Sequence, residues 1–470
     1  MTQELEVMDN VDAEAKTKKG HPKGLYLLFF TEMWERFSYY GMRGILMLYL
    51  TKTWLEGGLS IDPQHASLIY GFFTGFVYFT PLIGGWLADK YLGQRKAISI
   101  GGIVMMLGQL VLFAINTHAG LYFGLVLLII GNGFFKPNIS TMVGGLYAEG
   151  DKRRDSAFSI FYMGINLGAF MAPLIIGYLT DELFSTRNAG GEIISYGYRY
   201  GFLASAIGML LGQLMFNTMA KKYLGELGVK PLGSKKNQAV NNLGESLTQP
   251  LNKVEKDRIG VIFIFFFFAI FFFAGFEQAG SSLTLYTDKF IDRTVFGDFT
   301  IPTAWFQSVN PLFIVLLAPL FAILWQSDLG GRLSTPIKMG SGMIILGIGF
   351  FFMLGAVAER GGDIDDPSIK ASIWWLVLTY LTHTIGELCL SPVGLSVVTK
   401  LSPPRLASLL MGVWLLSSFF ANILGGFLAS YVEALGAGKI FLYISIFVIV
   451  CGAAMIALNK KIVNMMHGVK

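Results

Sequence analysis

The chain has 470 residues, of which 53% are hydrophobic and only 14% are charged, and its mean hydropathy is +0.57. This composition is too apolar for a soluble globular protein, so we expect an integral, multi-pass membrane protein. The net charge of +5 would favour nucleic acid or other anionic partners in a soluble protein. In a membrane protein it more often reflects topology, and we expect no nucleic-acid partner.

Apolar runs long enough to cross about 30 Å of hydrocarbon recur along the chain and predict twelve membrane-spanning helices. They follow a polar tail, 1–23, which has no apolar core typical of a signal peptide. Six helices are expected at 24–51, 66–88, 97–116, 120–146, 157–180 and 199–220. Six more are expected at 258–288, 304–325, 337–358, 372–399, 406–431 and 438–459, before a short tail at 460–470.

The polar segment 221–257 separates the two sets of helices and reads as a cytoplasmic linker. We therefore predict an all-α membrane fold of two six-helix bundles, 24–220 and 258–459, as in transporters that work by alternating access. Lys and Arg are about three times as frequent in the loops on the side of the termini as on the opposite side, which predicts that both termini are cytoplasmic.

Seven ionisable residues fall inside the predicted helices, where each costs about 2.5 to 3.5 kcal/mol and is a candidate for function. They are Glu32, Glu35, Arg36, Arg43, Lys136, Glu277 and Glu387. The four on the first helix share one face by their spacing. Helix rise puts Arg43 at the depth of Glu277 and Lys136 at the depth of Glu387, so we expect that either pair can meet.

Four of these groups are carboxylates and three are cations, so one carboxylate lacks a fixed partner. In a medium of low dielectric constant an unpaired acid must bind a proton, a cation or a cationic part of a substrate. An unpaired interior carboxylate is the least that proton coupling requires. The alternative is that the seven charges form static ion pairs that hold the helices in register.

Other polar and aromatic residues of the helices are open to two interpretations. Trp34, Tyr39, Tyr40, Tyr70, Tyr78 and Trp414 either line a cavity or pack and anchor the helices. Asn166 and Asn310 are mid-helix amides that either join helices or contact substrate. Asn310 and Lys136 each precede a proline, where we expect kinks.

The sequence offers no metal or catalytic constellation. His383 lies four residues before Glu387, but two groups make no metal site, and we expect a hydrogen-bonded interior histidine. Cys389 and Cys451 lie in different helices, which excludes a disulfide framework. No Walker A, G-x-S-x-G or H-E-x-x-H motif occurs, which argues against an ATP-driven pump or a membrane hydrolase. We expect neither enzyme activity nor a cofactor.

Several stretches resemble one family. The stretch from Glu32 to Arg43 contains E-x-x-E-R, a signature of the proton-dependent oligopeptide transporters, a branch of the major facilitator superfamily. Residues 133–138 and 161–168 look like this family's helix 4 and helix 5 signatures, and residues 276–278 and 387–391 match its helices 7 and 10. The loop after Gly84 resembles the motif shared across the superfamily.

The resemblance implies a symporter that imports di- and tripeptides with protons, driven by the proton gradient, in a bacterial inner membrane. It implies proton coupling by Glu32, Glu35, Arg36, Lys136 and Glu277, and an outer gate formed by Arg43 and Glu277. The implied substrate-binding residues are Arg36, Tyr39, Tyr40, Tyr70, Lys136, Asn166, Asn310, Glu387, Ser391 and Trp414. The implied partners are peptides, protons and membrane lipid.

Two departures from the family pattern matter. Many bacterial members insert two extra helices between the bundles, and the linker here is too polar to supply them. Animal members carry a helix 2 histidine where we align Gly71, so proton coupling falls to the glutamates. The rival functions are transport of another small anion or zwitterion, such as nitrate or a drug-like solute, and a receptor or membrane enzyme.

Overall fold

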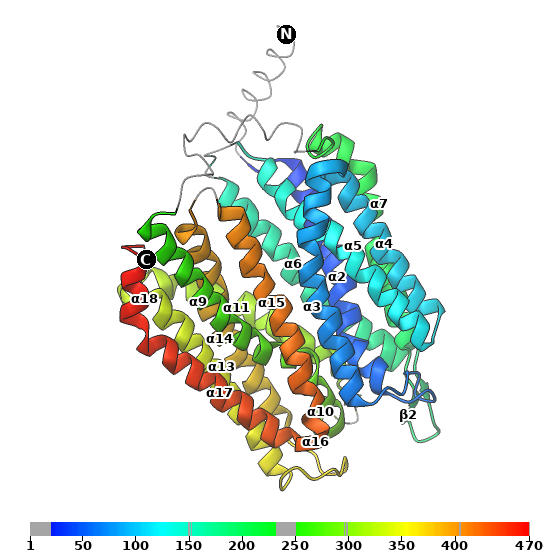
Figure 1. Cartoon of the computed structure of the whole chain (residues 1–470). Coiled ribbons are helices and arrows are strands. Elements are labelled where there is room, and N and C mark those ends of the chain that lie inside the picture. Colours follow the sequence, from blue (N-terminus) through cyan, green and yellow to red (C-terminus); the bar gives the residue numbers. More distant parts are fainter. Residues whose placement is uncertain are drawn as a thin grey trace.

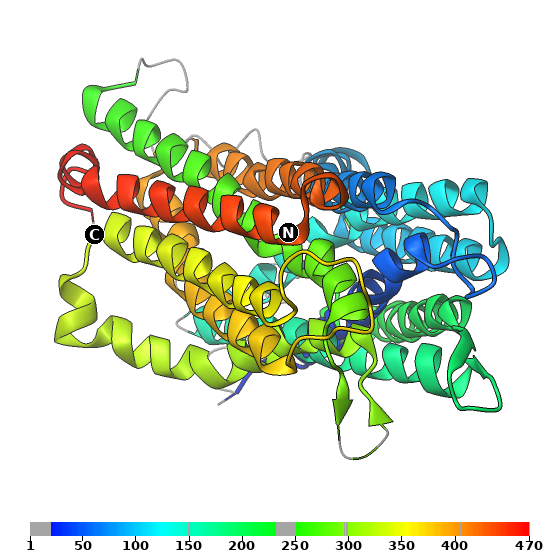
Figure 2. The ribbon, with the colours of Figure 1, turned by 90° about the horizontal axis from the view of Figure 1, so that it is seen from below.

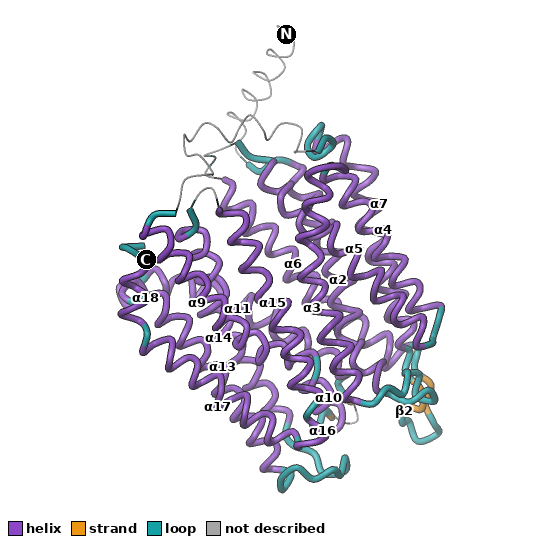
Figure 3. The backbone as a smooth tube through the Cα atoms, viewed as in Figure 1, coloured by secondary structure: helices purple, strands orange, loops and turns teal. Residues whose placement is uncertain are grey.

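The computed structural model describes residues 20–148, 151, 153–231, 251–295, 297, 299–403 and 406–469. Most of the expected tail 1–23 and the centre of the expected linker 221–257 lie outside these residues. The described part is nearly all helical, with two short hairpins (Figure 1, Figure 3). The hairpins pair β1 (Thr186–Arg187) with β2 (Ile193–Ser195) and β3 (Thr294–Val295) with β4 (Phe299–Thr300), both antiparallel.

Long helices account for every predicted span. The first bundle contains α2 (Lys23–Thr51), α3 (Pro63–Leu87), α4 (Gln94–Ala114), α5 (His118–Gly145), α6 (Arg153–Tyr178) and α7 (Tyr198–Leu224). One turn of π-helix extends α3 (η1, Ala88–Leu92) and another extends α6 (η2, Leu179–Leu183). The second bundle contains α9 (Lys253–Phe276), α11 (Val309–Gln326), α13 (Thr335–Glu359), α14 (Ile373–Leu401), α15 (Ala407–Ser430) and α17 (Ala437–Ala457).

Short helices complete the second bundle. They are η5 (Glu277–Gly280), α10 (Ser282–Phe290), η6 (Thr303–Ser308), α12 (Asp328–Arg332), α16 (Val432–Leu435) and α18 (Asn459–Met465). Within the described residues, eleven helices are long and apolar enough to cross a membrane. The other long helix, α2, carries four of the seven interior charges. The chain is an integral multi-pass membrane protein, as predicted.

Two predictions of local structure were wrong. The span 258–288 is not one helix, because the 3₁₀ turn η5 separates α9 from α10. Asn310 is not in mid-helix either, because η6 precedes α11 and puts Asn310 in the first turn of α11. Pro311 is tolerated there because the N–H groups of a first helical turn have no intrahelical acceptor, so a residue without an N–H loses no hydrogen bond. In contrast, α5 continues through Pro137 without interruption.

Each bundle has its own hydrophobic core, one centred on α2 and its neighbours and the other on α9, α13 and α14. The bundles lie side by side (Figure 2) and meet mainly where α3 packs on α15 and α6 on η6. Glycine permits the first of these contacts. A Cβ atom added to Gly71 would lie 2.7 Å from the Cα of Gly426 on α15, so the two backbones touch with no room for a side chain.

Polar contacts between the bundles gather at the end remote from the connection between α7 and α9, which we call the far end. The Lys52 ammonium lies 2.8 Å from the Asp288 carboxylate, and Arg43 pairs with Glu277. The Trp305 indole donates to the carbonyl of Leu174 (2.9 Å), and the Ser308 hydroxyl donates to that of Phe170 (2.7 Å). The bundles are therefore fastened to each other at the far end.

We expect Gly71→Ala to destabilise the protein by about 1 to 3 kcal/mol, because the added methyl group forces α3 away from α15. Thermal unfolding of the purified protein in detergent would measure this loss. The control is Gly331→Ala, because an added Cβ there meets nothing within 4 Å. Equal unfolding temperatures for the two variants would contradict the close backbone contact.

Candidate functional site

Three charges form a buried cluster on α2. The Arg36 Nε atom lies 2.9 Å from Glu32 Oε1 and 2.5 Å from Glu35 Oε2. These three residues are each at most 4% exposed. Because removal of charge from water costs several kcal/mol per ion, such a cluster persists only if its members neutralise one another. The single Arg36 guanidinium forms ion pairs with both carboxylates.

Asn132 on α5 also belongs to this cluster, although sequence reasoning missed it. Its amide donates to Glu35 Oε1 at 3.3 Å, and its side chain is buried. A signal was available in the sequence. Asn132 is a polar residue in an apolar helix, and it lies four residues before Lys136, hence on the same face.

Lys136 follows on α5, one turn beyond Asn132. Its ammonium lies 4.2 Å from the centroid of the Tyr78 ring, which is a cation–π contact. Within the described residues no carboxylate oxygen lies within 4 Å of this ammonium. The positive charge is therefore only partly compensated by its surroundings.

Glu387 is the counterpart of Lys136 in the second bundle. Its Oε2 atom accepts a hydrogen bond from the amide of Asn310 at 2.9 Å, and the same amide lies 3.0 Å from the Thr384 hydroxyl. None of the described cations forms an ion pair with Glu387. One turn further along α14, the Ser391 hydroxyl is buried without a hydrogen-bond partner in the described part of the chain.

The interior charges pair differently from the expectation that a single carboxylate lacks a partner. Four carboxylates and three cations left one carboxylate over, but Arg36 takes two carboxylates and Arg43 takes Glu277. Two groups of opposite sign remain, Lys136 in one bundle and Glu387 in the other. The predicted match in depth between them does not produce an ion pair.

The predicted pairing of Arg43 with Glu277 is present at the far end. Glu277 opens the 3₁₀ turn that ends α9, and Arg43 also donates through Nε to the Tyr70 hydroxyl at 2.6 Å. Gly280 makes room for this arrangement, because a Cβ atom added there would lie 1.8 Å from the Tyr70 oxygen. Tyr70 therefore belongs to the contact that closes the far end.

The remaining candidates occupy three settings. Tyr39 and Tyr40 meet edge to face with 5.3 Å between ring centroids, and the Arg36 guanidinium lies 5.7 Å from the Tyr39 ring. Asn166 donates to a carbonyl of its own helix at 2.9 Å. Trp414 is 4% exposed and packs in the core of the second bundle against Gly394.

His383 is interior as predicted, at 1% exposure. Its ring lies 4.7 Å from that of Phe350, and its imidazole interacts with the backbone of Leu346. The described residues contain no group of three His, Cys, Asp or Glu side chains that would hold a metal ion.

A sequence model described as the POT family matches residues 95–224 and 229–440 of this chain. The chain belongs to the POT family. Among curated relatives, an uncharacterized transporter, YclF of Bacillus subtilis, is 38% identical, with 96% of each chain covered. A peptide transporter of Yersinia enterocolitica is 35% identical, again over 96% of each chain. A di-/tripeptide transporter of Lactococcus lactis is 33% identical over 98% of this chain and 100% of its own length.

Solved POT structures share the fold. A peptide transporter in complex with sulfate superimposes with a TM-score of 0.85 at 34% identity, covering 96% of each chain. A POT family transporter in complex with 5-aminolevulinic acid gives a TM-score of 0.84 at 30% identity, covering 94% of this chain and 97% of the other. The fold is therefore the major facilitator fold, and this POT protein is a transporter and not an enzyme.

We expect Arg43→Ala and Glu277→Ala each to destabilise this POT protein by about 3 to 5 kcal/mol, because either change leaves one charge buried and unpaired. The double variant should lose much less than the sum of the two, because it removes both charges. Chemical unfolding in detergent would measure all three. Additive losses would show that the two side chains do not depend on each other.

Proposed function

We propose that this POT protein is a proton-coupled symporter that imports di- and tripeptides by alternating access. Residues 24–220 and 258–459 are the two bodies that rock about the site, and both termini face the cytoplasm. Relatives named as peptide transporters, alike over nearly their whole length, support the substrate class. A bacterial plasma membrane is the proposed location, and no cofactor enters the mechanism.

One observation carries the proposal. Lys136 and Glu387 are partly buried charges of opposite sign on different bundles, and each lacks an ion-pair partner in the described chain. A zwitterionic peptide supplies a carboxylate for the first and an ammonium group for the second. Binding would thus neutralise both charges and draw the two bundles together, which is what alternating access requires of a substrate.

The carboxylate end of the peptide is assigned to Lys136 and Arg36. The buried Nη2 atom of Arg36 has no hydrogen-bond partner among the described residues and is free to donate to a carboxylate. The amino end is assigned to Glu387 and Asn310. Tyr39, Tyr40, Tyr70, Asn166, Ser391 and Trp414 are proposed to shape the space between the two ends, where apolar and aromatic surface accepts varied side chains.

Proton coupling is assigned to the cluster on α2. Glu32 and Glu35 compete for one guanidinium, so protonation of either relieves their mutual repulsion. A peptide carboxylate that engages Arg36 weakens its hold on both glutamates and favours uptake of a proton. Substrate and proton would therefore bind cooperatively, and Lys136 and Glu277 contribute through their charge.

The contact of Arg43, Glu277 and Tyr70 is proposed as the outer gate, closed in the conformation described. To expose the site to the outside, the far end must lose this contact together with the bond from Lys52 to Asp288. Among the described residues, the ion pairs and hydrogen bonds that join the two bundles lie at the far end. This supports a conformation that is closed toward the outside.

A second candidate is another small zwitterion, because one similar POT transporter has been solved with 5-aminolevulinic acid. The site described above requires a positive group on the substrate opposite Glu387. Nitrate lacks one, so it is the weaker alternative.

We expect Lys136→Ala to abolish peptide uptake driven by a proton gradient, because the substrate carboxylate and the glutamates on α2 lose a nearby cation. Uptake of a labelled dipeptide into proteoliposomes would measure this effect. Tyr78→Phe is the matched control, since it keeps the ring under the ammonium and should transport. Wild-type uptake by Lys136→Ala would contradict the assignment.

We expect Glu387→Ala to weaken the binding of peptides with a free amino terminus by about tenfold or more, the equivalent of at least 1.4 kcal/mol for a lost charged contact. Peptides with an acetylated amino terminus should bind equally to both proteins. Competition against a labelled peptide would measure both affinities. An unchanged preference for the free amino terminus would remove Glu387 from the site.

A further inference from the structure

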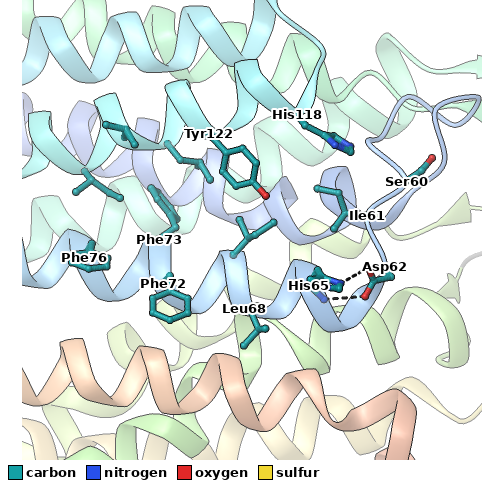
Figure 4. A pocket seen from close by; sticks show the side chains of 14 residues that line it. Ser60, Ile61, Asp62, His65, Leu68, Phe72, Phe73, Phe76, His118 and Tyr122 are labelled. Atoms are coloured by element: carbon teal, nitrogen blue, oxygen red, sulfur yellow. Dashed lines mark hydrogen bonds and ion pairs between the residues drawn. The ribbon is translucent and has the colours of Figure 1, made fainter.

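A groove of about 530 Å³ runs along the flank of the first bundle between α3 and α5 (Figure 4), and none of the seven interior charges lines it. Its floor and walls are apolar along most of its length, with Leu68, Phe72 and Phe76 on α3 and Val126 and Ile129 on α5. Phe72 is 42% exposed and Val126 is 49% exposed. These side chains face the space that lipid occupies around a membrane protein.

The mouth of the groove is polar and lies at the far end. Ser60, Asp62 and His65 border it where α3 begins, and His118 borders it where α5 begins. His65 Nδ1 lies 2.6 Å from Asp62 Oδ2, and His118 Nε2 lies 3.1 Å from the carbonyl oxygen of Leu59. The other nitrogen of each imidazole makes no hydrogen bond to the described residues. The mouth thus presents two imidazoles, a carboxylate and a hydroxyl.

The length of the groove matches one leaflet of a bilayer. His65 and Phe76 are eleven residues apart on one helix, which corresponds to about 17 Å at 1.5 Å per residue. Half of a hydrocarbon core of about 30 Å is about 15 Å. The groove is therefore long enough to hold an acyl chain of one leaflet, with its polar mouth at one end.

We propose that this groove binds one phospholipid of the leaflet at the far end, with an acyl chain against Phe72, Phe76 and Val126. The headgroup ammonium donates hydrogen bonds to Asp62 and to the free imidazole nitrogens, which accept because the other nitrogen of each ring donates to an oxygen. The Ser60 hydroxyl at the mouth is the group that donates to the phosphate. A phosphoethanolamine headgroup ends in such an ammonium group and is the chemistry that these acceptors fit. The side chain of His65 is 70% exposed, so it is accessible to such a headgroup.

The bound lipid would also contact the junction between the bundles. Phe76 lies 5.5 Å from Phe419 of α15 between ring centroids, and Phe72 lies 6.1 Å from Phe427 of the same helix. The aromatic rings that wall the groove are therefore the rings that span from one bundle to the other. Occupancy of the groove would support α3 where it packs on α15.

The test is retention of phosphatidylethanolamine by the purified full chain, followed by native mass spectrometry as detergent is exchanged. We expect wild type to retain one molecule more than Val126→Trp, whose indole fills the groove. Leu214→Trp is the matched control, because Leu214 is a 53% exposed residue of α7 outside the groove. Equal retention by wild type and Val126→Trp would overturn the proposal and leave only freely exchanging lipid.

A second measurement keeps the proposal testable if Val126→Trp does not fold. Added phosphatidylethanolamine should raise the thermal unfolding temperature of wild type more than that of His65→Ala. This substitution leaves the backbone cap of α3 intact, because Asp62 accepts from the backbone N–H of residue 65. Diacylglycerol, which lacks the phosphoethanolamine headgroup, should stabilise both proteins equally. Equal stabilisation of both proteins by phosphatidylethanolamine would exclude the headgroup contact.

Discussion

Burial of charge is the constraint on which this structure depends. Lipid cannot solvate the seven interior ionisable groups, so each must find compensation from protein, substrate or proton. Arg36 compensates two glutamates and Arg43 compensates Glu277. Within the described residues, Lys136 contacts an aromatic ring and Glu387 an amide, and neither forms an ion pair. The paired charges stabilise α2 and join the two bundles, and the proposed transport mechanism uses the two charges that have no ion pair.

Close packing decides where those charges can move. Gly71 brings α3 against α15, and Gly280 leaves space for Tyr70 beside Arg43, so the far end is fastened through backbone contact as well as charge. Because packed interfaces have discrete arrangements, a change of charge at the site is more readily transmitted as rigid-body rocking than as gradual deformation. The lipid groove beside α3 lies against this same junction.

Much of the architecture could be predicted from the sequence, because the requirement for about 20 apolar residues per span is strict. Long helices lie at the twelve predicted positions, although η5 interrupts the span 258–288, and equal helical depth correctly paired Arg43 with Glu277. Equal depth did not predict an ion pair correctly for Lys136 and Glu387, because depth gives no information on the lateral distance between the two bundles. Hydropathy also missed the turn at Glu277, since a 3₁₀ break within an apolar run leaves its composition unchanged.

The missed partner Asn132 illustrates a different limit. A count of charges leaves out neutral amides. A buried amide that donates to Glu35 nevertheless stabilises its negative charge and belongs to the same hydrogen-bonded cluster. His383 illustrates the same limit, because a sequence cannot indicate which groups surround a buried imidazole. Both residues would have required knowledge of which helix faces meet.

The most direct test is uptake of a labelled dipeptide into liposomes that contain the purified protein, with and without an imposed inward proton gradient. The account predicts accumulation that requires the gradient and is suppressed by unlabelled di- and tripeptides but not by free amino acids. Folded protein that accumulates no peptide under the gradient would contradict it.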